Sequence, residues 1–148
     1  MKLPATLENL RLFLEHVTLC ASQLTLSRER LNEIELVVEE ALVNIIRYAY
    51  PGRTGYIEVK CNLIAGGGIE IIIADEGISF DIQTLPDPDT SADLMNRKTG
   101  GLGVFFIKRM ANEVRYSRDG KRNVLTLIIH PERRSVSRQA KYTSLQTQ

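Results

Sequence analysis

The sequence predicts an α/β (α+β) fold, a two-layer sandwich in which helices cover one face of a mixed, mostly antiparallel sheet. The predicted elements run helix, helix, strand, strand, loop, helix, strand, strand, and each pair of strands is joined closely enough to form a hairpin. Strands and helices do not alternate, and no glycine fingerprint follows the first strand, so a doubly wound dinucleotide-binding domain is disfavoured. A length of 148 residues suits one domain with a core of its own.

The N-terminal part of the chain predicts a first helix that ends near residue 22. A short strand is possible at residues 2–3, and Thr6 stands where a helix N-cap is expected. The apolar residues of this segment recur at helical spacing and share one face: Leu7, Leu10, Phe13, Leu14 and Val17. That face is expected to pack on the core.

The second helix is predicted to begin after a cap at Ser27 and to stop at Pro51-Gly52. At about 100° per residue, one continuous face is apolar. Its residues are Leu31, Ile34, Val38, Ala41, Leu42, Ile45 and Ala49. Apolar residues also occur on the other sides of this helix, so we expect most of it to be buried.

A polar strip runs along the far side of the second helix and consists of Glu33, Glu40, Asn44 and Arg47. Such groups are costly in a protein interior unless they face a cavity, a ligand or a metal ion. The alternative is a solvent-facing strip with ion pairs between neighbouring turns. The helix alone does not decide between the two.

The strands are predicted from alternation and from turn residues. Residues 56–64 alternate apolar and polar, residues 65–68 form a glycine-rich turn, and residues 69–74 are rich in isoleucine, which together predict a first hairpin. Residues 112–117 and 123–130 predict a second hairpin around Asp119-Gly120.

Between the hairpins, residues 78–98 lack periodicity, and a loop of this length inside a compact domain is usually functional or mobile. The glycines at 100, 101 and 103 then open a third helix. We expect a domain over residues 1–131 and a disordered tail over residues 132–148, where the chain is polar and without pattern.

Composition excludes several function classes. A formal net charge of +1 gives no reason to expect a nucleic acid or an anionic membrane as partner. No segment approaches the roughly 18 apolar residues of a membrane span, and no signal peptide is visible, so a cytoplasmic protein is expected. Cys20 and Cys61 lack metal-type spacing and suit reduced thiols. For His16 and His130 we expect structural or surface roles.

Three stretches carry residues suited to chemistry. Glu40 and Asn44 are one helical turn apart, and a carboxylate can accept a proton while an amide oxygen suits Mg²⁺. Asp75-Glu76-Gly77 follows a buried strand, where a carboxylate can accept from an exocyclic amine. The glycines before the third helix can form an anion-binding nest. Singly each has a plain alternative, namely chance spacing, a turn or loop chemistry, but together they describe a site for one nucleotide.

In this order the stretches resemble the motifs of the Bergerat-fold ATPases, and within them the small anti-sigma-factor serine-protein kinases of bacterial partner-switching systems. Residues 40–44 resemble the N box of that family, residues 75–81 its first glycine box and residues 99–103 its second. The resemblance covers about residues 5–130. Many relatives have a second glycine where this chain has Ser79.

The resemblance implies a role for each matching residue. Glu40 would be the general base, Asn44 the Mg²⁺ ligand and a nucleotide contact, and Arg47 a phosphate contact. Asp75 would take the adenine amine, and Gly77 would let adenine approach.

The second glycine box would bind the phosphates through its backbone N–H groups. The positions implied are Gly100, Gly101, Leu102, Gly103 and Val104. Thr126 on the last strand is a weaker candidate for the adenine pocket, and the basic lid residue of the family corresponds to Arg97 or Lys98.

The function implied is an ATP- and Mg²⁺-dependent serine-protein kinase that phosphorylates an anti-anti-sigma antagonist and binds a sigma factor as an anti-sigma factor. The resemblance also implies a homodimer, formed through the N-terminal strand and first helix. The alternative is a non-catalytic ATP-binding module that sequesters a regulator. A histidine-kinase catalytic domain is disfavoured because no helix pair with a phospho-accepting histidine precedes the second helix.

Overall fold

The structure is a computed structural model that describes residues 1–81 and 101–132. Residues 82–100 and 133–148 lie outside the described residues. Gly100, the alternatives Arg97 and Lys98, most of the predicted loop and nearly all of the predicted tail therefore remain predictions.

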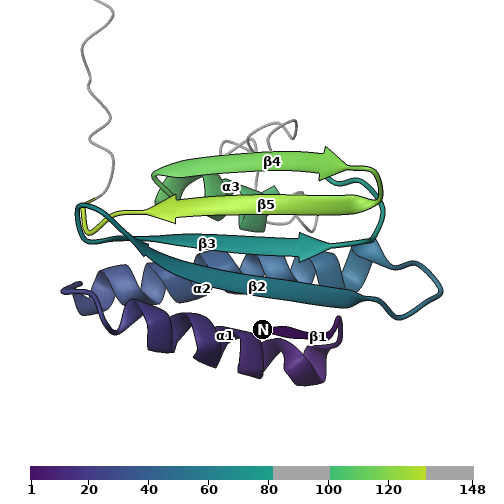
Figure 1. The fold of residues 1–148 in the computed structure, drawn as a ribbon, viewed down its shortest axis with the longest axis horizontal. Coiled ribbons are helices and arrows are strands. Elements are labelled where there is room, and N and C mark those ends of the chain that lie inside the picture. Colours follow the sequence, from purple (N-terminus) through teal and green to yellow (C-terminus); the bar gives the residue numbers. More distant parts are fainter. Residues whose placement is uncertain (82–100, 133–148) are drawn as a thin grey trace, which may run out of the picture.

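Five strands form one sheet with the order β1-β2-β3-β5-β4, and all four described pairings are antiparallel. In chain order the elements are β1 (Lys2–Pro4), α1 (Leu7–Ala21), α2 (Arg28–Asn44), η1 (Ile45–Ala49), β2 (Tyr56–Ile64), β3 (Gly68–Asp75), α3 (Gly101–Met110), β4 (Glu113–Asp119) and β5 (Arg122–Ile129). In the view of Figure 1, α2 and α3 pass behind the sheet, and α1 packs against α2 and β2. The predicted α/β sandwich with two hairpins is confirmed.

The core forms between α2 and the inward-facing residues of the two central strands. Ile71 of β3 lies opposite Leu127 of β5, and both are fully buried because alternate residues of each strand point to the helices. The predicted apolar face of α2 is confirmed, with Ile34, Val38 and Leu42 buried.

The first helix also follows the prediction over most of its length. Phe13 and Val17 are buried, Leu10 and Leu14 pack against the core, and Leu7 is exposed at the N-terminal end. On α2, the predicted cap is confirmed because the Ser27 side chain accepts a hydrogen bond from the Arg30 N–H at 3.1 Å.

The last turn of the second helix differs from a regular α-helix. The α-helix ends at Asn44, and Ile45–Ala49 form η1, a single π-helical turn. The Ala49 carbonyl accepts a hydrogen bond from the Ile78 N–H at 2.9 Å, so this wider turn is joined to the segment after β3. Single π-helical turns occur frequently at functional sites.

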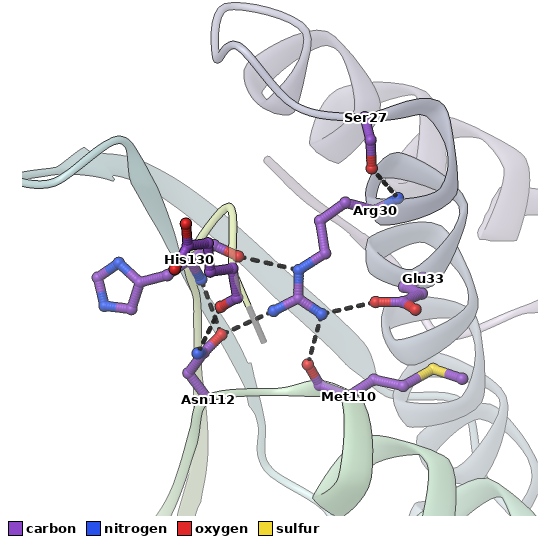
Figure 2. Close-up of polar contacts among 7 residues, drawn as sticks. Ser27, Arg30, Glu33, Met110, Asn112 and His130 are labelled. Atoms are coloured by element: carbon purple, nitrogen blue, oxygen red, sulfur yellow. Dashed lines mark hydrogen bonds and ion pairs between the residues drawn. The ribbon is translucent and has the colours of Figure 1, made fainter. Parts of the chain in front are cut away.

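The predicted polar strip divides in two, and Glu33 does not share an environment with Glu40 and Asn44. Glu33 accepts a hydrogen bond at 2.6 Å from Arg30, which is 3% exposed. The Arg30 guanidinium also donates to the Met110 carbonyl at 2.9 Å, the Asn112 side-chain oxygen at 2.7 Å and the His130 carbonyl at 2.9 Å (Figure 2). These five residues, the Arg30 cluster, tie the start of α2 to the end of α3 and the end of β5.

The two cysteines are remote in sequence but contact each other in the fold. Both are free thiols, Cys20 on the last turn of α1 and Cys61 within β2. Burial raises the pKa of the Cys61 thiol to about 12, and the neighbouring Cys20 adds to the shift. Among the helices that the structure describes, none is long and apolar enough to cross a membrane.

Candidate functional site

A pocket opens where the end of α2 and η1 meet the ends of β3 and β5. It is lined by Ala41, Asn44, Ile45, Tyr48, Ala49, Asp75, Ile78, Phe80, Tyr116, Asn123 and Leu125. Two predicted site residues, Asn44 and Asp75, therefore lie in one cavity although β2 and a hairpin turn separate them along the chain. Its walls are largely apolar and aromatic, as is usual for a small-molecule site.

Asp75 is the last residue of β3 and is only 6% exposed. Its Oδ1 atom accepts two hydrogen bonds, from the Gly77 N–H at 2.7 Å and from the Asn123 side-chain amide at 2.9 Å. No residue that the structure describes donates to Oδ2. This second oxygen is thus the acceptor that Asp75 can offer to a ligand in the pocket.

Gly77 has a structural reason to be glycine. A Cβ atom at this position would lie 2.5 Å from both the carbonyl oxygen and the Cβ atom of Ala49. The loop after β3 consequently packs directly on η1, and this contact brings the Asp75 end of β3 against the Asn44 end of α2.

Tyr50 holds the same loop from the other side. Its hydroxyl donates to the Tyr56 carbonyl at 2.7 Å and accepts from the Glu76 N–H at 2.8 Å. Arg53 stacks over the Tyr50 ring at 4.9 Å and donates to the Glu76 carbonyl at 3.1 Å. Burial raises the pKa of the Tyr50 hydroxyl above its ordinary value, so the hydroxyl stays protonated and able to donate.

Asn44 carries an unsatisfied polar atom. Its Nδ2 atom is buried and has no hydrogen-bond partner in the part of the chain that the structure describes. Buried polar atoms are nearly always paired, so an orphan in a cavity indicates a missing ligand, ion or water. Since the two ends of an amide are assigned rather than observed, either atom can face that ligand.

The protein groups near Asn44 suit a cation that takes few ligands from the protein and most from waters and a bound substrate. Within residues 1–81 and 101–132, no three His, Cys, Asp or Glu side chains gather as a metal site. Mg²⁺ commonly takes only one or two protein oxygens and completes its shell with waters and substrate phosphates. The Asn44 amide therefore fits Mg²⁺ bound together with a nucleotide.

Glu40 lies one turn before Asn44 on α2 and contacts the first turn of α3. A Cβ atom at Gly103 would lie 2.1 Å from Glu40 Oε2, so the carboxylate occupies the space that a larger residue would fill. The first backbone N–H groups of a helix have no partner within the helix. Val104 points into the core, and Leu102 is 41% exposed.

Of the predicted site residues that the structure describes, only Asn44 and Asp75 line the pocket. Glu40, Gly77 and the start of α3 lie beside it, and Arg47 and Thr126 lie apart from it. Arg47 is exposed on η1. Thr126 pairs with Ile72 in the middle of the sheet, whereas the residue opposite Asp75 is Asn123.

Sequence reasoning assigned no site role to the other lining residues, among them three tyrosine or phenylalanine rings and one amide: Tyr48, Phe80, Tyr116 and Asn123. One feature of the sequence could have indicated Asn123. It has the same phase along β5 as Leu125 and Leu127, which face the core, and a polar residue on the buried face of a strand needs a partner. The aromatic residues carry no comparable pattern.

The profile of the histidine kinase-like ATPase domain matches residues 3–129. The chain belongs to this family. Most of the described elements, and both residues that meet in the pocket, lie within the match.

Named relatives of the histidine kinase-like ATPase family extend the comparison. Serine-protein kinase RsbW of Listeria monocytogenes serovar 1/2a is 30% identical over 136 residues, which cover 88% of this chain and 86% of that protein. Serine-protein kinase RsbW of Bacillus licheniformis is 29% identical over 141 residues, with 90% and 86% covered. The chain is thus a relative of serine-protein kinases over nearly their whole length.

A solved structure supports the fold. A blue-light activated histidine kinase from Erythrobacter litoralis superposes with a TM-score of 0.50 at 20% sequence identity. The match covers 70% of this chain, and the chain spans about a third of that kinase (31%).

Proposed function

We propose that the chain is an ATP-dependent serine-protein kinase and anti-sigma factor, which phosphorylates a small anti-anti-sigma antagonist in a bacterial partner-switching system. The observation that carries the proposal is the buried Nδ2 atom of Asn44, which has no hydrogen-bond partner among the described residues and lies in the pocket with Asp75, one helical turn from Glu40. Similarity to serine-protein kinases along 86% of their length supports the choice of kinase.

The pocket would bind the adenine base. The free oxygen of Asp75 would accept a hydrogen bond from the exocyclic amine. Tyr48, Phe80 and Tyr116 would provide apolar surface beside the ring, because a flat base loses exposed area when it packs on aromatic side chains. Gly77 keeps the loop close to η1, so no side chain intrudes from there.

The phosphates would extend from the pocket toward the first turn of α3. Backbone N–H groups from Gly101 through Val104, with Gly100 before them, would donate to phosphate oxygens, because these groups have no acceptor within the helix. Asn44 would hold Mg²⁺, which neutralises phosphate charge when bound. Arg47 would add a positive charge from the end of η1.

Glu40 would serve as the general base. As the hydroxyl oxygen of a substrate serine bonds to the γ-phosphorus, its proton would pass to the Glu40 carboxylate, and ADP would leave with the electrons of the broken P–O bond. A side chain against the start of α3 is suitably close to the proposed phosphate site for this role.

The proposal is tested in two stages. Calorimetry should detect Mg·ATP binding to the wild type and little or none to Asp75→Asn, with ADP and GTP as controls. Transfer of labelled phosphate from ATP to candidate antagonist proteins should then be lost in Glu40→Gln while nucleotide binding remains. Full transfer by Glu40→Gln would show that the base is misassigned, and no nucleotide binding at millimolar concentration would refute the site.

A second candidate is a non-catalytic ATP-binding module that sequesters a regulator. The observation that favours it is that Glu40 packs against Gly103 and does not line the pocket. In that case the wild type would bind Mg·ATP and a sigma factor but would transfer no phosphate to any antagonist.

We also propose a cytoplasmic homodimer, formed through the N-terminal strand and first helix. β1 is an edge strand of the sheet, and Leu12 and Leu19 of α1 are exposed apolar residues. Light scattering should give twice the monomer mass, and Leu19→Glu should reduce it. A monomer at working concentration would contradict the proposal.

A further inference from the structure

We propose that Asn123 is a positioning residue that acts through Asp75 and makes the pocket prefer 6-amino purines over 6-oxo purines. This inference rests on the proposed nucleotide site and goes further, because it gives base selectivity to a residue outside the predicted set. Asn123 is 5% exposed and lies directly opposite Asp75 in the pairing of β5 with β3.

The orientation of the Asn123 amide is fixed by two neighbours on β4. Its Oδ1 atom accepts from the Tyr116 hydroxyl at 2.8 Å and from the Arg118 guanidinium. A guanidinium can only donate, so the atom that faces Arg118 must be the amide oxygen. The usual ambiguity of an asparagine side chain is thereby removed, and the NH₂ group must face the other way.

The NH₂ group faces only acceptors. It donates to Asp75 Oδ1 at 2.9 Å and to the Ile78 carbonyl at 3.0 Å. Because the Gly77 N–H donates to the same Oδ1 atom, that oxygen is directed away from the base and Oδ2 is left for it. The Asp75 carboxylate is consequently held in one rotation as a pure acceptor.

A pure acceptor discriminates between purine edges. The 6-amino group of adenine can donate to Oδ2, whereas the 6-oxo group of hypoxanthine places a second acceptor there. If Asn123 is removed, the carboxylate is free to turn, and the difference between the two bases should shrink. A purely structural role of Asn123 would weaken both nucleotides alike.

The test compares ATP with ITP, which differ only at the purine edge and carry the same phosphates. Calorimetry with Mg²⁺ should show that wild type prefers ATP, and that Asn123→Ala lowers the ratio of ATP to ITP affinity about tenfold, mainly through weaker ATP binding. Val124→Ala, next to Asn123 on β5 but not lining the pocket, is the matched control and should keep the wild-type ratio.

A second variant keeps Asn123 itself. Tyr116→Phe combined with Arg118→Met removes both donors to the amide oxygen, so the amide can flip, and the ratio should fall about threefold. This variant decides the question if Asn123→Ala does not fold. An unchanged ratio in either folded variant would overturn the inference alone, whereas a wild type that binds neither nucleotide would overturn it together with the proposed site.

Discussion

The helix α2 carries buried polar groups at both of its ends, and the two ends differ in how completely these groups are paired. Near its start, all three guanidinium nitrogens of Arg30 donate to acceptors of the Arg30 cluster. Near its end, the buried Nδ2 atom of Asn44 and one oxygen of Asp75 have no hydrogen-bond partner among residues 1–81 and 101–132.

This difference indicates that the start of α2 has a structural role and that its end forms part of a binding site. A buried polar group left unpaired costs about 1–3 kcal/mol, so a fold retains one only where something else completes it. The closed Arg30 cluster needs nothing further and joins α2, α3 and β5. The open pocket lacks an acceptor for one group and a donor for another, and a nucleotide with Mg²⁺ would provide both.

The largest effect is expected at the closed end. Arg30→Met should lower the free energy of unfolding by about 3–5 kcal/mol, because the buried Glu33 carboxylate then loses its ion pair with Arg30. Urea unfolding followed by circular dichroism measures the loss. Arg30→Met with Glu33→Met should recover part of it, since no buried charge remains.

The matched control for Arg30 is an exposed ion pair with similar chemistry. Arg11 pairs with Glu15 at 2.7 Å on the outer surface of α1, where its side chain is 86% exposed. Arg11→Met should leave the unfolding midpoint unchanged. If Arg30→Met were equally harmless, the cluster would not have the structural importance assigned to it.

The second prediction compares the stability lost on removing an asparagine side chain from the Arg30 cluster with that lost on removing one from the pocket. Asn112→Ala should cost about 2 kcal/mol, because its side chain accepts from Arg30 and from the His130 N–H and donates to the Glu132 carbonyl. Asn44→Ala should be neutral or stabilising by up to about 1 kcal/mol, since it removes an orphan donor and alanine favours helix. Urea unfolding of both variants measures the difference, and calorimetry should show loss of Mg·ATP binding in Asn44→Ala alone. A large destabilisation by Asn44→Ala would show that the amide is paired after all.

Much of the fold follows from local pattern. The alternation of residues 56–64 predicts β2 correctly, Ser27 caps α2 as expected, and the turn around Gly120 has the positive φ of 56° that favours glycine. These features depend on neighbours within a few residues, so one sequence is sufficient to find them.

The remaining features depend on contacts between distant segments. Glu33 and Glu40 lie two turns apart on one face of α2, yet they meet different partners, because Arg30 and the residues around 110–130 close only one end. The pairing of Asn123 with Asp75 requires the order of strands in the sheet. The π-helical turn keeps the apolar spacing of an α-helix and leaves no trace in the sequence pattern.

The two glycines beside the pocket differ in what a larger residue would meet: backbone at Gly77 and a flexible side chain at Gly103. Gly77→Ala should cost about 1–2 kcal/mol, because the new Cβ meets the backbone of Ala49. Gly103→Ala should change stability by less than about 1 kcal/mol, because the obstacle is the tip of the flexible Glu40 side chain, but phosphotransfer should fall as Glu40 is displaced. Urea unfolding and a transfer assay on both variants test the contrast. Equal stability losses in the two would contradict it.

The smallest effect is expected at an ion pair on the face of the sheet away from the core. Glu58 pairs with Arg122 and Lys60, and hydrogen bonding by Arg122, then by Lys60, lowers the pKa of Glu58 below its ordinary 4.5. A carboxyl whose folded-state pKa is lowered contributes stability above pH 4.5 and loses it as pH falls through the folded-state value. Glu58→Gln should therefore cost at most about 0.5 kcal/mol at pH 7, and less below pH 4.5, where the carboxyl of the unfolded chain takes up its proton first and the contribution of the ion pair declines. Urea unfolding of both proteins at pH 7 and pH 3.5 measures this loss of stability. A loss as large as that of Arg30→Met, or one that is undiminished at pH 3.5, would contradict the expectation that the more exposed Glu58 pair contributes less stability than the buried Arg30–Glu33 pair.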